Sequence, residues 1–151
     1  MKAFEFRLDQ ALRWRSTQVD IEKSHAAQAA ARLAAIRAEL EARRTELREA
    51  PRHLSAGSNG ASLESFGVWT NRIRRHIADL EKKAKEAAAA LAARMELLLE
   101  ANRKRRLLEN LRQTEHGRWR VESNRELEAF AGEAFLGRLQ SKNGRARSSG
   151  G

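Results

Sequence analysis

The chain has 151 residues, and 92 of them are Ala, Glu, Lys, Leu or Arg, a composition typical of long helices and coiled coils. Eight aromatic residues and one proline give poor support to an open sheet, a barrel or a sandwich, because these folds use large aromatics in the core and Gly or Pro in the turns. Thirty Lys and Arg against twenty Asp and Glu give a charge of +10, which favours anionic partners, and the absence of Cys excludes disulfides and thiolate metal sites.

Residues 8–49 predict the first helix, which we expect to begin near residue 5. Twelve positions, alternately three and four residues apart, form one stripe, and nine of them are apolar: Leu8, Leu12, Arg15, Val19, Glu22, Ala26, Ala29, Leu33, Ile36, Leu40, Arg43 and Leu47. This period, held over about five heptads, is the a/d pattern of a coiled coil. The three charged exceptions have long side chains that can reach the rim of a helix pair.

The connection between the helices is predicted to span residues 50–61. Pro51 cannot continue a helix interior, and Ser55-Ala56-Gly57-Ser58-Asn59-Gly60 is rich in turn-forming residues. Either Ser62 or Ser65 is expected to cap the next helix, and the sequence leaves the choice between them open.

Residues 62–136 predict a second, longer helix, because no proline follows Pro51. Its apolar stripe is Phe66, Trp69, Ile73, Ile77, Leu80, Ala84, Ala87 and Leu91. The stripe then drifts through Met95 and Leu98, is interrupted at Asn102 and Arg105, and resumes at Leu108 and Leu111. Gly117 is expected to be the weakest point of this helix, and residues 140–151 predict a disordered basic tail.

Two helices of unequal length joined by a short loop predict an all-α fold, a long antiparallel two-helix coiled coil that forms one domain over residues 1–139. The second helix is expected to extend past the first by about 25–30 residues, or about 40 Å. Residues 87–93, a run of Ala and Leu without charge, are too few to cross a membrane, and the first twelve residues lack the apolar core of a secretory signal. We therefore expect a cytoplasmic protein without a membrane span.

The sequence lacks the residue patterns of common catalytic and cofactor sites. It has no phosphate-binding glycine motif and no His-Glu-x-x-His, and its four histidines are scattered. Glu22 and His25 match the Glu-x-x-His spacing of di-iron bundles, but no second copy accompanies them. We therefore expect a protein that is not an enzyme and that holds no metal and no cofactor.

Residues 101–122 are the most basic part of the chain, with seven Lys and Arg against three Glu. The run Arg103, Lys104, Arg105 and Arg106 can contact nucleic-acid phosphates or an acidic protein surface, or can form an ordinary solvated helix face. No aromatic residue interleaves the run for base stacking, so a nucleic-acid partner is not expected.

The few aromatic residues gather near the ends of the predicted helices. Phe4, Phe6, Trp69, Trp119 and Phe130 are most simply core anchors of the hairpin. Trp119, Leu127 and Phe130 nevertheless lie where the first helix cannot cover all of them, and exposed aromatics on an extended helix would indicate a partner site. For Trp69 the core and partner interpretations both remain open.

Three motifs in order resemble the FliJ family, the stalk and chaperone-escort protein of flagellar export, over nearly the whole chain. They are Phe4-x-Phe6-x-Leu8-x-x-x-Leu12-x-x-Arg15, the basic stretch Asn102-Arg103-Lys104-Arg105-Arg106-Leu107-Leu108-Glu109-Asn110-Leu111, and Trp119-x-x-Glu122-x-x-Arg125-Glu126-Leu127-Glu128-x-Phe130-Ala131. The chain departs from the family pattern at Arg15 and Glu22 in the contact face and at Gly117.

The resemblance implies a long antiparallel coiled coil that inserts into the export ATPase ring, stimulates it, meets the export-gate membrane protein and recycles substrate chaperones. By position, Trp69 and Ile73 are the expected export-gate contacts. The expected contacts with the ATPase ring are Phe4, Phe6, Trp119, Leu127, Phe130 and Ala131.

The same resemblance implies a cytoplasmic protein associated peripherally with the inner membrane at the flagellar base. Two alternatives remain open: the equivalent stalk of a virulence-type secretion system, and a basic helical nucleic-acid-binding protein.

Overall fold

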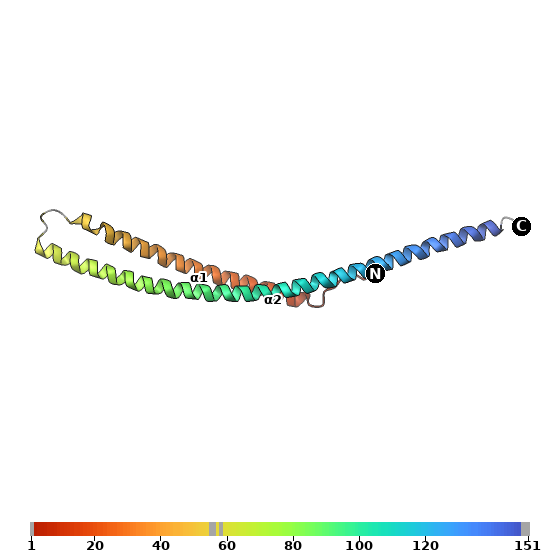
Figure 1. The fold of residues 1–151 in the computed structure, drawn as a ribbon, viewed down its shortest axis with the longest axis horizontal. Coiled ribbons are helices and arrows are strands. Elements are labelled where there is room, and N and C mark those ends of the chain that lie inside the picture. Colours follow the sequence, from red (N-terminus) through yellow and green to blue (C-terminus); the bar gives the residue numbers. More distant parts are fainter. Residues whose placement is uncertain (1, 55–56, 58, 149–151) are drawn as a thin grey trace. The chain divides into compact units, whose positions relative to one another are not determined.

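A computed structural model describes residues 2–54, 57 and 59–148 (Figure 1), and within these residues every regular element is helical. The elements are α1 (Asp9–Glu49), the short 3₁₀ helix η1 (Ala50–His53) and α2 (Gly60–Ser148). The predicted all-α helical hairpin is therefore confirmed. The chain divides into two compact units, residues 15–103 and residues 1–14 with 104–151, and each is described by itself below.

In the unit of residues 15–103, α1 and α2 lie side by side and antiparallel, joined at one end through η1 and the loop (Figure 1). The buried apolar residues repeat every seven positions, as in a coiled coil: Val19, Ala26, Leu33 and Leu40 on α1, and Ile73, Leu80 and Ala87 on α2. All the predicted stripe residues of this unit up to Leu91 are buried or half-buried, including Arg15, Glu22 and Arg43. The heptad interpretation of both helices is confirmed here.

Polar pairs between the two helices flank this apolar seam. His76 Nε2 lies 3.1 Å from Glu39 Oε1, and Arg44 donates from NH2 to Glu81 Oε1 at 3.1 Å. Hydrogen bonds to Glu41 and Glu81 raise the pKa of the Arg44 guanidinium above its ordinary value. Such exposed pairs contribute little free energy, so the seam carries most of the stability of the helix pair.

The N-cap of α2 is Asn59, and the prediction of Ser62 or Ser65 was wrong. Asn59 Oδ1 accepts hydrogen bonds from the Ser62 backbone N–H at 2.9 Å and from the Ser62 hydroxyl at 2.8 Å. The helix therefore begins at Gly60, two residues before the predicted start. Gly57 has φ +103°, a left-handed conformation that glycine adopts without strain, while Ser55, Ala56 and Ser58 of the predicted loop lie outside the described residues.

Replacing Asn59 with Ala is expected to lower the free energy of unfolding by about 1 kcal/mol, because the substitution removes the acceptor for two donors of the first helical turn. Urea unfolding followed by circular dichroism measures this change. Ser65→Ala is the matched control and should change stability little, because Ser65 lies exposed beyond the cap. Equal effects of the two substitutions would contradict the assignment of the cap.

In the unit of residues 1–14 and 104–151, α1 begins at Asp9 and not near residue 5 as predicted. The Asp9 N–H donates to Phe6 O at 3.0 Å, and the Asp9 carboxylate lies 3.0 Å from Arg13 Nε. Phe6 and Leu12 are buried, whereas Leu8, which the stripe placed in the seam, is exposed. The residues before Asp9 form a non-helical segment, and the Phe4 ring of this segment contacts α2, as described below.

α2 continues as helix to Ser148, past the predicted end at residue 136 and through residues 140–148, where a disordered tail was predicted. Leu139, Lys142, Arg145, Ala146 and Arg147 are good helix formers and no proline interrupts them, so the backbone can remain helical here. Residues 149–151 lie outside the described residues.

Gly117 lies inside α2 and does not break it. A Cβ added at this position meets no atom within 4 Å. Gly117→Ala is therefore expected to raise the stability of this part of α2 by about 1 kcal/mol, because Ala loses less backbone entropy on helix formation. The check is a slower amide hydrogen exchange at residues 113–121. Unchanged or faster exchange there would contradict the prediction.

Candidate partner-binding surfaces

An aromatic cluster joins the N-terminal segment to α2. The ring of Phe4 meets His116 edge to face, with centroids 4.9 Å apart, and lies 5.9 Å from the Trp119 ring. His116 and Trp119 stack at 5.7 Å, and Trp119 Nε1 donates to Lys2 O at 3.3 Å. The structure thus brings together two of the predicted ATPase-ring residues, Phe4 and Trp119, each half-buried. Phe6 is buried, so its side chain is not offered to a partner.

Beyond Ser123, which is buried, α2 has no covering segment among the described residues. We call residues 124–148 the arm, and every residue in it is exposed. Leu127 is 55% exposed and Phe130 72%, and the exposed Ala131 lies beside them on the helix. These three predicted contact residues therefore form a solvent-facing surface, as expected for a partner site.

Three further apolar residues of the arm were missed by the sequence interpretation. Phe135, Leu136 and Leu139 are exposed large side chains within the arm. The spacing of Phe135, eight residues after Leu127, was the signal that could have identified it, because positions i and i+8 share a helix face. Leu136 and Leu139 widen the apolar surface toward the end of α2.

Near the loop, Trp69 is half-buried and its ring lies 5.9 Å from that of Phe66. Trp69 lines an open groove of about 490 Å³ together with Ala42, Thr45, Glu46, Glu49 and His53. Trp69 is thus partly packed within the hairpin and partly exposed in the groove at its surface. Ile73, the other predicted export-gate contact, is buried in the seam and does not present its side chain to a partner.

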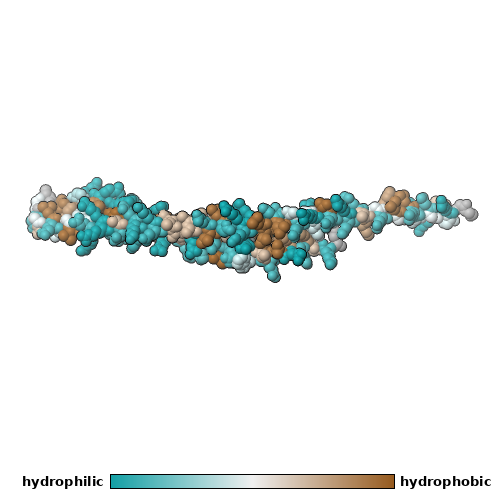
Figure 2. Space-filling model, turned by 60° about the horizontal axis from the view of Figure 1, so that its bottom comes forward, coloured by the Kyte–Doolittle hydropathy of each residue, from teal (hydrophilic) through white to brown (hydrophobic). Residues whose placement is uncertain are grey.

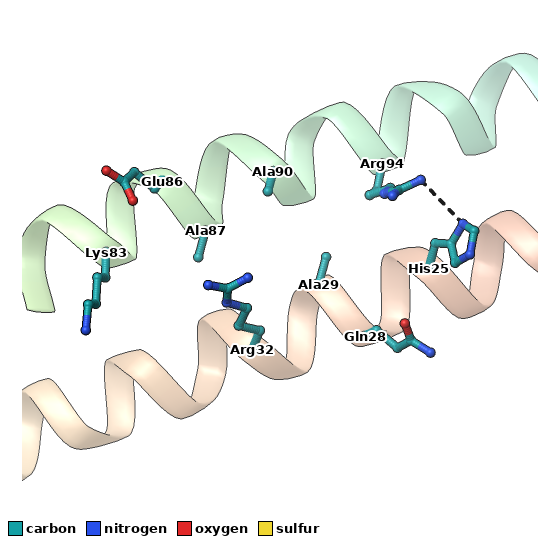
Figure 3. A pocket seen from close by; sticks show the side chains of 9 residues that line it. All are labelled: His25, Gln28, Ala29, Arg32, Lys83, Glu86, Ala87, Ala90 and Arg94. Atoms are coloured by element: carbon teal, nitrogen blue, oxygen red, sulfur yellow. Dashed lines mark hydrogen bonds between the residues drawn. The ribbon is translucent and has the colours of Figure 1, made fainter.

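A second groove, of about 510 Å³, opens between α1 and α2 where small side chains face one another (Figure 3). Ala29 and Ala87 lie at its floor, and cationic groups from both helices surround it: Arg32 from α1, and Lys83 and Arg94 from α2. Arg94 NH1 lies 3.4 Å from His25 Nδ1, which closes one end. The sequence identified the small alanines of this layer, but the cations lie outside the heptad stripe and were missed.

The basic run consists of solvent-facing side chains with one exception. Arg103, Lys104 and Arg106 are exposed, whereas Arg105 is half-buried and its Nε lies 3.4 Å from Glu109 Oε1. Asn102 is also half-buried. The two polar residues predicted to interrupt the stripe therefore occupy partly covered positions of α2.

Among the described residues, no cluster of three or more His, Cys, Asp or Glu is arranged to hold a metal ion. Within the same residues, neither α1 nor α2 contains an apolar stretch that could span a lipid bilayer.

Comparison of the chain with protein-family models, with characterised proteins and with solved structures finds no match.

Proposed function

We propose that this chain is a non-enzymatic stalk and chaperone-escort protein of the flagellar type III export apparatus, which inserts into the export ATPase ring and couples it to the export gate. The proposal rests on the three motifs that resemble the FliJ family and on one structural observation that carries it furthest. That observation is the arm, a helical extension of α2 whose apolar side chains nothing in the described chain covers. A helical rod that binds inside a ring needs such an exposed contact surface and needs no catalytic site.

In this proposal the ATPase ring contacts the arm through Leu127, Phe130 and Ala131. Phe4 and Trp119 contribute from the aromatic cluster, while Phe6 is buried and would contribute only to the stability of the N-terminal segment.

For the export gate, Trp69 is the proposed contact, because it lies at the surface of the groove near the loop. Ile73 is buried, so it would contribute only indirectly, by stabilising the apolar seam near Trp69. Binding of substrate chaperones, and peripheral association with the inner membrane through the gate, belong to the same proposal.

The exposed members of the basic run, Arg103, Lys104 and Arg106, are proposed to face acidic residues in the lumen of the ring. Opposite charges across such a surface speed association more than they tighten it. Reversal of these three residues to Glu is therefore expected to slow stimulation of the ATPase at low salt.

The test is ATP hydrolysis by the purified flagellar export ATPase with and without this chain. Stimulation by the chain is expected, and Leu127→Ser with Phe130→Ser should abolish it. Leu99→Ser is the matched control, because Leu99 has the same 55% exposure as Leu127 but lies outside the arm. Absence of stimulation by the unmodified chain would overturn the proposal.

The alternatives give different outcomes in parallel assays. Stimulation of a virulence-system ATPase but not the flagellar one would identify the equivalent stalk of that system. DNA binding that weakens steeply with salt, without an effect on either ATPase, would identify a nucleic-acid-binding protein.

A further inference from the structure

The exposed apolar residues of the arm follow the spacing of a helix face that packs against another helix. Leu127, Phe130, Ala131, Ala134 and Phe135 occupy positions i, i+3, i+4, i+7 and i+8, the pattern of an amphipathic helix that packs along one side. Phe130 is 72% and Phe135 63% exposed. Figure 2 shows hydrophobic side chains gathered on α2 toward the C-terminal end that Figure 1 marks.

Three glycines weaken the arm as a lone helix in water. It contains Gly132, Gly137 and Gly144, and glycine destabilises a helix interior relative to Ala because it loses more backbone entropy on folding. Helices in proteins owe most of their stability to packing of an apolar face, and the described chain supplies no covering segment for this one. A partner helix along the arm would supply that packing.

The charged residues of the arm, together with Glu122 just before it, form an acidic half and a basic half. Residues 122–133 contain four Glu and one Arg, a net charge of −3. Residues 138–147 contain three Arg and one Lys and no acidic residue, a net charge of +4. The uncharged residues 134–137 separate the two halves.

We propose that the arm docks antiparallel against the arm of a second copy of this chain. In that orientation, centred near Phe135, the acidic half of each copy lies along the basic half of the other, and the apolar faces meet in the middle. A parallel arrangement would set like charges against each other, which is unfavourable. The inference concerns the chain alone and does not depend on the proposed function.

The first test is the oligomeric state of the full chain by sedimentation equilibrium over micromolar to submillimolar concentrations. A monomer–dimer equilibrium is expected, and Phe130→Ser with Phe135→Ser should raise the dissociation constant on the order of 100-fold, since each ring buries apolar area against the other copy. Val68→Ser is the control, because Val68 is also strongly exposed on α2, at 60%, but lies outside the arm. A chain that remains monomeric throughout would overturn the proposal.

Charge reversal tests the antiparallel pairing. Reversal of the acidic half by Glu126→Lys, Glu128→Lys and Glu133→Lys should give a monomer, and so should reversal of the basic half by Arg138→Glu, Lys142→Glu and Arg145→Glu. A variant with all six changes should dimerise again, because the two halves are complementary once more. Failure of the six-fold variant to dimerise, with its hairpin helicity intact, would overturn the charge-paired arrangement.

The orientation can be read directly, because the natural chain has no cysteine. Asn124→Cys and Ala146→Cys place one thiol eleven residues on each side of Phe135 and on nearly the same helix face. When the two variants are mixed and oxidised, an antiparallel dimer should give the mixed 124–146 disulfide in excess. Predominance of 124–124 and 146–146 disulfides would overturn the antiparallel orientation.

Self-association and ring binding also have separable outcomes. A dimer that does not stimulate any export ATPase would leave the inference standing and remove the proposed function. A monomer that stimulates the ATPase through Leu127 and Phe130 would do the reverse.

Discussion

Replacing Leu80 by Ala is expected to lower the free energy of unfolding of the helical hairpin by about 3 kcal/mol. Leu80 is 3% exposed and lies in the middle of the seven-residue repeat on α2, between Ile73 and Ala87. The next buried residue of the repeat is an alanine, so the neighbouring layer cannot fill the space that the substitution leaves. Loss of transfer free energy and creation of a cavity therefore add up.

The measurement is urea unfolding of the full chain, followed by circular dichroism. Leu97→Ala is the matched control, because Leu97 lies on the same helix but is 49% exposed, and its loss should change stability by less than about 0.5 kcal/mol. Similar effects at the two positions would show that the seam is not where the stability of the hairpin resides.

The heptad seam could be predicted from the sequence because its cause is local. Helical side chains three and four residues apart share a face, so burial follows from the period of apolar residues alone. The same argument explains why Arg15, Glu22 and Arg43 were correctly placed in the stripe although they are charged. They are half-buried, as long side chains at the edge of a seam should be.

The N-cap of α2 was predicted wrongly because several neighbouring residues can fill that position. Asn59, Ser62 and Ser65 can all cap a helix, and the path of the chain out of the loop selects Asn59, with Ser62 as the donor to its side chain. The preferences of residue types for the N-cap position do not reveal the path that the backbone takes into the helix.

The N-terminal segment shows a different limit. Nothing in residues 2–8 forbids a helix, but the Phe4 ring packs against His116 and Trp119 of α2, and Phe6 is buried. Such long-range contacts override local propensity. The cations around the alanine groove were missed for a similar reason, because two helices together bring them to one place.

Replacing Phe6 by Ala is expected to release the N-terminal segment from α2, at a cost of about 3 kcal/mol to its docking. Phe6 is 8% exposed and its carbonyl accepts the Asp9 N–H at the start of α1, so its ring and its backbone fix the segment together. Loss of the ring should free Phe4 from Trp119 and expose the indole to water.

Tryptophan fluorescence can report this release in a background with Trp14→Phe and Trp69→Phe, which leaves Trp119 as the only tryptophan. Phe6→Ala should shift the Trp119 emission to longer wavelength and make residues 2–8 sensitive to limited proteolysis. Leu8→Ala is the control, because Leu8 is 41% exposed and its truncation should leave both signals unchanged. If Phe6→Ala also left both unchanged, the contacts of Phe4 and Lys2 with Trp119 would have to hold the segment without the buried ring.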